Sequence, residues 1–146
     1  MPSPSKKKFK IGIARIIDAN INRAKEGLRV CEEITRFIIG SPGLTASLKD
    51  TRHALKTASQ KLLPVSDLLK ERDIRQDVGR NIYGTELKRK DYRDIFFANI
   101  QRVKESVRVL EEFAKLKDKN TAIVFKKIRY RLYESEKRIA GILASS

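Results

Sequence analysis

Two stretches of the chain carry the same polar residues at the same spacing. "ANINRAKEGLRVCEE" (19–33) and "ANIQRVKESVRVLEE" (98–112) place Asn20 and Arg23 in the first copy and Asn99 and Arg102 in the second. A guanidinium group binds phosphate through paired N–H groups, and an Asn amide can both donate and accept hydrogen bonds. The pattern therefore makes these residues candidates for holding an anionic ligand.

One further Arg recurs in the helix that follows each copy. "LKDTRHAL" around Arg52 aligns with "FKKIRYRL" around Arg129. At about 100° per residue, the two Asn and the four Arg fall on the apolar sides of their helices. A buried unpaired guanidinium costs several kcal/mol, so each Arg needs a carboxylate, a carbonyl, water or an anionic ligand. The structural alternative is pairing within the bundle, with Glu136 the clearest partner and Glu32 and Glu111 as further candidates.

The same helical wheel sorts the neighbouring residues. Asp18 falls on the polar side, together with Arg29 and Arg36, and is expected to face solvent. Gly27 and Ser106 fall on the apolar side at equivalent positions of the two copies. Their small side chains leave room either for a ligand or for a close approach of two helices.

A segment between the copies offers acidic residues. "RDIRQDVG", within residues 72–84, places Asp73 and Asp77 four residues apart, with Gly79 close behind. Paired carboxylates suit Mg²⁺ that also binds phosphates, although Asp and Gly are equally ordinary turn residues. We therefore take Asp73 and Asp77 as the candidate metal-binding and catalytic residues.

Helices must position all of these side chains. Apolar residues recur at three- and four-residue steps over about 13–39, 45–63, 91–117 and 121–143, and no segment shows the alternation of a strand. Ser66 and Asp67 can cap a further short helical piece. Residues 1–10, with Pro, Ser and a Lys cluster, are expected to form a flexible basic tail.

The two copies extend beyond single helices. Ten of sixteen positions are identical between 19–34 and 98–113, and the following helices also align. The sequence thus predicts an all-α fold, a four-helix bundle built from a duplicated helical hairpin with a unique central loop. The single domain is expected to span 11–146, with repeat A at about 13–64, the connecting loop at about 65–90 and repeat B at about 91–143.

Composition narrows the partners. Lys and Arg number 33 against 18 acids in 146 residues, a net charge of +15, which favours an anionic partner. The single Cys31 excludes an internal disulfide, and no apolar run is long enough for a membrane span, so a cytoplasmic location without a membrane partner is expected. His53, the only histidine, is expected at the surface or in helix packing rather than in catalysis. The tyrosines Tyr83, Tyr92, Tyr130 and Tyr133 can stack on a ring, although packing is their commoner use.

Five segments in order resemble one family: "RIIDANINRAKEGLRVCEEITRF", "TRHAL", "RDIRQDVG", "ANIQRVKESVRVLEEFAK" and "RYRLYESE". They resemble the small all-helical hydroxymethylpyrimidine phosphate kinase domain that some bacteria fuse in front of thiamine phosphate synthase. The resemblance covers about residues 15–137. It implies ATP-dependent conversion of 4-amino-5-hydroxymethyl-2-methylpyrimidine phosphate to the diphosphate. The chain stops at Ser146 without a synthase barrel, so its product is expected to pass to a separate thiamine phosphate synthase.

The chemistry of phosphoryl transfer suggests a role for each candidate. Positive groups hold donor and acceptor phosphates in line, and a metal bridges the donor oxygens. Arg23, Arg52, Arg102 and Arg129 are expected to hold phosphates, Asn20 and Asn99 to orient the pyrimidine or the ribose, and Asp73 and Asp77 to hold Mg²⁺ with ATP as co-substrate. Because the two half-sites are similar, the unique loop at 72–84 is expected to be what distinguishes donor from acceptor.

Three alternatives come from other classes. The chain can be a non-catalytic helical partner of a synthase, in which case its inward Arg residues all pair with protein acids. Its charge can serve RNA or DNA, but the basic residues are spread along every helix rather than gathered into a stripe with aromatics, which disfavours nucleic acid. Charged helices can also reflect a heat-adapted surface. The long helices leave a homodimer open.

Overall fold

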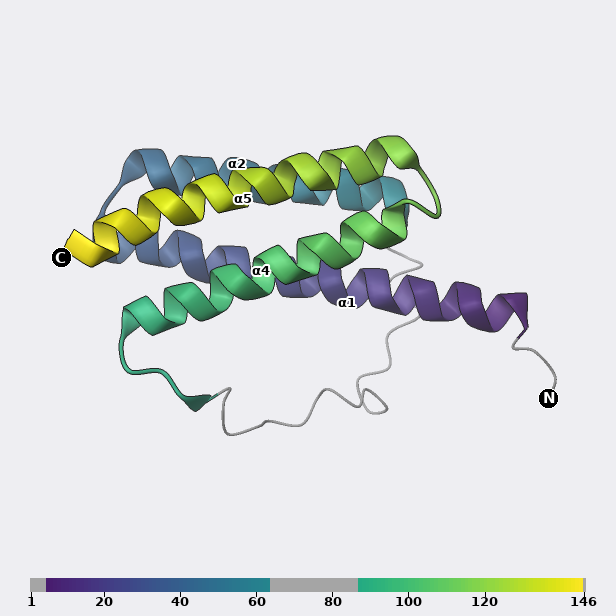
Figure 1. The fold of residues 1–146 in the computed structure, drawn as a ribbon, viewed down its shortest axis with the longest axis horizontal. Helices are drawn as coiled ribbons and strands as arrows, with labels where there is room; N and C mark the ends of the chain where they lie inside the picture. Colours follow the sequence, from purple (N-terminus) through teal and green to yellow (C-terminus); the bar gives the residue numbers. More distant parts are fainter. Residues whose placement is uncertain (1–4, 64–86, 146) are drawn as a thin grey trace.

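The computed structural model describes residues 5–63 and 87–145, and these form helices and no strand. The elements are α1 (Lys6–Glu33), the π-helical turn η1 (Ile34–Ile39), α2 (Pro42–Leu62), α4 (Tyr92–Ala114) and α5 (Lys119–Ser145). Figure 1 shows an elongated bundle made of the α1–α2 hairpin and the α4–α5 hairpin. The predicted all-α helical bundle is confirmed.

The helices alternate in direction around the bundle. In Figure 1, α1 and α5 run from right to left, whereas α2 and α4 run from left to right. Each helix packs against two antiparallel neighbours, and the most extensive contact joins α1 to α4. The two hairpins therefore meet chiefly through their first helices, which carry the repeated Asn and Arg residues.

The first helix begins earlier than the sequence predicted. The Ser5 side chain accepts a hydrogen bond from the Lys8 backbone N–H at 3.2 Å, and α1 starts at Lys6. This side-chain cap satisfies one of the free N–H groups of the first turn. The expected flexible tail is therefore wrong from Lys6 onward. Residues 64–86, which include the short helical piece expected at Ser66 and Asp67 and the loop at 72–84, lie outside the described residues.

The turn of the first hairpin has a defined local structure. The final turn before it is the π-helical segment η1, which ends at Gly40 in the left-handed conformation with φ 71°. Glycine adopts this conformation without a Cβ clash. Ser41 then caps α2, and Pro42 occupies its first turn. The hydroxyls of Thr35 and Thr45 lie 2.9 Å apart and join the two sides of the turn.

One apolar core runs through the bundle. Its largest fully buried side chains come from all four helices and include Ile17, Leu28, Leu48, Leu55, Phe96, Ile100, Phe125 and Leu132. Cys31 lies among them with no exposed surface. Burial, and secondarily the nearby Glu32 and Glu136, raise the pKa of the Cys31 thiol to about 12. The thiol is therefore neutral at ordinary pH and serves packing.

Gly27 lies where α1 and α4 approach most closely. A Cβ built there would be 2.6 Å from Cγ2 of Val103 and 3.1 Å from the backbone oxygen of Asn99. Ser106, the equivalent residue of the second copy, is also buried, and its hydroxyl donates to the Arg102 carbonyl at 2.7 Å. Of the two alternatives for these small residues, close helix approach holds at Gly27.

We expect Gly27→Ala to lower the free energy of unfolding by about 1–2 kcal/mol, because the added methyl group forces α1 and α4 apart. Gly141→Ala is the matched control, since a Cβ at Gly141 meets nothing within 4 Å. There the gain in helix propensity should stabilise by up to about 1 kcal/mol. Urea unfolding followed by circular dichroism measures both. Equal stabilisation by the two substitutions would contradict the close approach.

Candidate functional site: two related basic pockets

The repeated Arg of each second helix pairs with a buried Glu of the first helix. Arg52 donates from Nε and Nη2 to the two carboxylate oxygens of Glu32, at 2.7 and 3.2 Å. Arg129 donates in the same way to Glu111, at 3.1 and 3.4 Å. Both carboxylates are nearly inaccessible, with Glu32 5% and Glu111 3% exposed. Equivalent residues thus make the same contact in both hairpins, which supports the duplication.

These contacts bear on the two explanations of the inward arginines, of which phosphate binding by Arg52 and Arg129 stays a prediction. Pairing within the bundle is confirmed for Arg52 and Arg129. Glu136, which the sequence made the clearest partner, was a wrong choice, because it instead pairs with Lys104 at 2.7 Å. Glu136 lies on α5, the same helix as Arg129, whereas the partner that the structure assigns to Arg129 comes from the neighbouring helix α4.

The other two repeated arginines do not face the bundle interior. Arg23 and Arg102 are both exposed, so their predicted inward orientation is wrong. Both lie at the margin of the apolar side, where a long side chain can carry its guanidinium group to solvent. They line neither of the pockets described below. A phosphate-binding role for them stays a prediction.

The repeated asparagines bond to their own helices. Asn20 is buried and donates from Nδ2 to the Ile16 carbonyl at 2.8 Å. Asn99 is half-buried and makes the equivalent bond to Ile95 at 2.8 Å. The inward orientation of Asn20 is confirmed. The expectation that either Asn orients a pyrimidine or a ribose is not tested by these contacts and stays a prediction.

Asp18 differs from the expectation that it faces solvent. It is only 6% exposed, and its Oδ1 accepts from Nδ2 of Asn22 at 3.4 Å. The prediction was wrong because α1 packs against both α2 and α4, which covers a wider arc of the helix than a single interface does.

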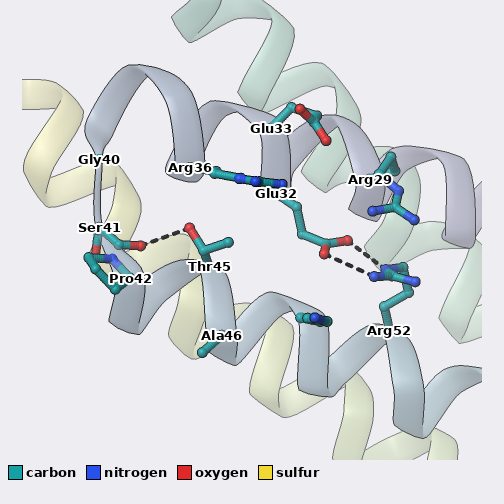
Figure 2. A pocket seen from close by; sticks show the side chains of 11 residues that line it. Arg29, Glu32, Glu33, Arg36, Gly40, Ser41, Pro42, Thr45, Ala46 and Arg52 are labelled. Carbon is teal, nitrogen blue, oxygen red and sulfur yellow. Dashed lines mark hydrogen bonds and ion pairs between the residues drawn. The ribbon is translucent and has the colours of Figure 1, made fainter.

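Among the described residues, one pocket lies between α1 and α2, beside the hairpin turn (Figure 2). This α1–α2 pocket is an open cavity of about 530 Å³. Its cations are Arg29, Arg36, Lys49 and Arg52, and the remaining lining residues are Glu32, Glu33, Gly40, Ser41, Pro42, Thr45 and Ala46. Figure 2 shows the Glu32–Arg52 pair at the side of the cavity away from the turn.

The second pocket lies between α4 and α5. This α4–α5 pocket also measures about 530 Å³, and its lining residues are Arg108, Glu111, Lys115, Lys119, Ala122, Ile123, Lys126, Arg129 and Tyr130. Most of its charged residues have an equivalent in the α1–α2 pocket: the pairs are Arg29 with Arg108, Glu32 with Glu111, Arg36 with Lys115, Lys49 with Lys126, and Arg52 with Arg129. Each hairpin therefore builds its own version of one basic pocket.

The two pockets also differ. Thr45 and Ala46 of the α1–α2 pocket correspond to Ala122 and Ile123 of the α4–α5 pocket, and Tyr130 lines only the latter. The described residues of the two repeats are thus already unequal. The loop at 72–84 lies outside the described residues, so the expectation that it distinguishes donor from acceptor stays a prediction.

Charge pairing differs between the pockets as well. In the α4–α5 pocket, Arg108 bonds to Glu111 at 2.6 Å and to Glu112 at 3.1 Å, and Lys115 bonds to Glu112 at 2.8 Å. The hydrogen bond from Lys115 lowers the pKa of Glu112, which keeps this carboxylate ionised. Within the part of the chain that the structure describes, Lys119 and Lys126 have no ion-pair partner. These two lysines are therefore the cations most available to an anion there.

The α1–α2 pocket has more unpaired charge. Arg29, Arg36 and Lys49 make no ion pair with any residue of 5–63 or 87–145, while Arg52 is held by Glu32. Like charges gathered around one cavity attract anions. Sequence analysis had placed Arg29 and Arg36 on the solvated side, which is right, but missed that this exposed side lines a pocket. The repeat itself held the signal, because Arg29 and Lys49 recur as Arg108 and Lys126.

The remaining candidates lie elsewhere. Asp73 and Asp77 fall outside the described residues. Among the residues that the structure describes, no group of three or more His, Cys, Asp or Glu side chains is placed to hold a metal ion. His53 is exposed, as expected. In the same described part, no helix is both long and apolar enough to cross a bilayer.

Fold and site together define a class: a helical bundle of two duplicated hairpins, each with a cation-lined pocket closed on one side by a Glu–Arg pair. Residues 15–138 match the ThiD2 family, and the chain belongs to this family. No solved structure matches the chain significantly.

Curated relatives are similar over most of this chain. A thiamine-phosphate synthase of Synechocystis is 42% identical over 88% of the chain and 36% of its own length. The thiamine-phosphate synthases of Rhodopirellula baltica and Nostoc punctiforme are 38% and 34% identical, over 92% and 96% of the chain and 37% and 39% of their own lengths. The chain thus spans a little over a third of the relatives that it matches. These matches link the family to thiamine biosynthesis.

Proposed function

We propose that this protein is a kinase that uses ATP and Mg²⁺ to convert 4-amino-5-hydroxymethyl-2-methylpyrimidine phosphate to the diphosphate. A phosphate oxygen of the pyrimidine compound attacks the γ-phosphorus of ATP and forms a new P–O bond. The bond from the γ-phosphorus to the β–γ bridging oxygen breaks, and its electron pair leaves with ADP. The relatives are named thiamine-phosphate synthases, and an enzyme of that name would consume this diphosphate.

The observation that carries the proposal is the pair of basic pockets. Each has about 530 Å³ of space, which falls within the range of small-molecule sites. Each also presents cations to the cavity from two helices, and transfer between phosphates depends mainly on such positioned positive charge. Glu32 and Glu111 fix the guanidinium groups of Arg52 and Arg129 in place, so that their orientation is set before a ligand arrives.

The metal belongs to the same proposal. Mg²⁺ that bridges phosphates commonly takes one or two protein carboxylates. Asp73 and Asp77 would supply these carboxylates, and the metal would neutralise charge on the donor phosphates. No general base is needed, because the acceptor is already an ionised phosphate oxygen.

The direct test is to incubate the purified chain with the pyrimidine monophosphate, ATP and Mg²⁺ and to follow the diphosphate by ³¹P NMR. We expect diphosphate and ADP in equal amounts, and no product when EDTA replaces Mg²⁺. ADP without diphosphate would indicate an ATPase. No product from the chain, alone or mixed with a thiamine-phosphate synthase, would refute the kinase.

A second candidate is a non-catalytic accessory domain of thiamine-phosphate synthase. The observation that favours it is that the Synechocystis relative extends far beyond the match, which covers 36% of its length. An accessory domain would raise the rate of a synthase that is supplied directly with the pyrimidine diphosphate. A kinase would raise synthase flux only when the monophosphate and ATP are supplied. The two supply conditions therefore separate the candidates.

A further inference from the structure

The two pockets lie toward opposite ends of the bundle. α1 and α4 run antiparallel (Figure 1), and Gly27 of α1 packs against Asn99 and Val103 of α4. From this crossing, Glu32 lies further along α1 in one direction and Glu111 further along α4 in the other. At about 1.5 Å of rise per residue, the two carboxylates are separated by roughly 20 Å along the bundle axis.

This separation constrains the chemistry. In-line transfer requires the reacting atoms to come within about 3–3.5 Å of each other before the bond forms. A donor in one pocket and an acceptor in the other are too far apart for that. Within one chain, the described pockets are therefore not the donor and acceptor halves of a single site.

The α4–α5 pocket has the features of a site for a flat ring. Tyr130 lines it and remains 56% exposed, so that part of its ring is free to be covered. Two neighbouring side chains support the Tyr130 ring. Its centroid lies 5.3 Å from the Arg129 guanidinium carbon and 5.8 Å from the centroid of the Tyr133 ring, which it meets edge to face. Arg129 is fixed in turn by Tyr133 and Glu111. Ile123, 52% exposed, adds apolar surface to the same pocket.

The same pocket also has the charge for a phosphate. Lys119 and Lys126 line it without an ion-pair partner among the described residues. In the α1–α2 pocket, by contrast, no aromatic side chain is among the described lining residues. The residue equivalent to Tyr130 is His53, which does not line that pocket. Of the two pockets, only the α4–α5 pocket therefore combines an aromatic side chain for a ring with unpaired lysines for a phosphate.

We propose that the α4–α5 pocket binds a phosphorylated compound with a flat aromatic ring, which stacks on Tyr130 while Lys119 and Lys126 bind the phosphate. A nucleotide and a phosphorylated pyrimidine share this chemistry. The inference rests on the proposed function for the choice of these two compounds. Because the α1–α2 pocket is remote, the transfer partner has to meet the ring compound at the α4–α5 end of the bundle.

Calorimetric titration with ADP, the pyrimidine monophosphate and inorganic pyrophosphate tests the site. Tyr130→Ala should lower the affinity for a ring compound by at least about tenfold, because stacking is lost. The same substitution should lower the affinity for pyrophosphate by less than about threefold. Lys126→Glu should lower the affinity for the ring compound by at least about tenfold, because the charge that faces the phosphate is reversed. Two residues outside both pockets serve as controls: His53→Ala, at the position equivalent to Tyr130, and Lys127→Glu, at an exposed lysine of α5, should change the affinity for the ring compound by less than about threefold. Circular dichroism confirms that each variant is folded.

Three outcomes would overturn the site. These are an unchanged affinity in Tyr130→Ala, a loss of affinity in Lys127→Glu as large as in Lys126→Glu, and no binding of either ring compound. Binding that responds as expected in a chain without turnover would refute the kinase and leave the site standing. Turnover that none of the α4–α5 variants affects would refute the site and leave the kinase standing.

Discussion

Glu111→Ala is expected to lower the free energy of unfolding by about 2–4 kcal/mol, because it leaves a poorly solvated guanidinium group without its counter-charge. The Arg129 side chain is only 13% exposed and donates to Glu111 from two nitrogens. Hydrogen bonds to Tyr133 and then to Glu111 raise the pKa of Arg129. A guanidinium group stays protonated in proteins even without such partners, so Arg129 cannot lose its proton to relieve the loss. Arg108, which bonds the same carboxylate at 2.6 Å, loses a partner as well.

Glu32→Ala is the matched substitution in the other hairpin and should cost about 1 kcal/mol less. Its partner Arg52 is 26% exposed and can turn toward water when the carboxylate is removed. Urea unfolding followed by circular dichroism measures the free energies of unfolding of both variants. Glu111→Leu combined with Arg129→Met should recover at least half of the loss, because an apolar pair leaves no uncompensated charge. An effect of Glu111→Ala no greater than that of Glu105→Ala, an exposed control on the same helix, would contradict the role of the pair.

The fold was accessible from the sequence because a repeat doubles every local signal. The apolar period of 3.6 residues predicted all four helices, and Gly40 and Pro42 marked the first turn. The errors fall at helix ends and margins. Ser5 extends α1 into the expected tail, because a single side-chain oxygen decides where a helix begins. Asp18 is buried because the sequence does not state how many neighbours cover a helix.

The candidate site was only partly accessible from the sequence, for a physical reason. A helical wheel gives the direction of a Cα–Cβ bond, whereas a long Arg side chain places its charge several ångströms beyond it. Arg23 was therefore expected inside and lies outside, whereas Arg52 bonds to Glu32 and its expected phosphate-binding role stays a prediction. The pockets form between two helices, so their existence depends on interhelical packing. Arg36, which lines one of them, appears in the sequence only as a surface residue.

The duplicated pockets change how the unique segment should be understood. Their lining is unequal, with Tyr130 in one pocket only, so the described residues already offer one means of telling a ring compound from a simple anion. In the proposed kinase, the role left for Asp73 and Asp77 is to hold the metal ion. A carboxylate pair that holds Mg²⁺ on the donor phosphates acts mainly in the transition state, where negative charge is redistributed toward the leaving group. Its loss should therefore appear in turnover and scarcely in folding.

We expect Asp73→Asn or Asp77→Asn to lower Mg²⁺-dependent formation of the pyrimidine diphosphate by at least about a hundredfold, which corresponds to roughly 2.7 kcal/mol of transition-state stabilisation. Steady-state ³¹P NMR measures product, and circular dichroism checks the fold. Glu71→Gln, an acid of the same segment, is the matched control and should stay within about threefold of the unmodified chain. Affinity for ADP without Mg²⁺ should be unchanged in both Asp variants, because the α4–α5 pocket is intact. Near-normal turnover in both would remove these carboxylates from the mechanism and require that the metal be held by phosphates and water alone.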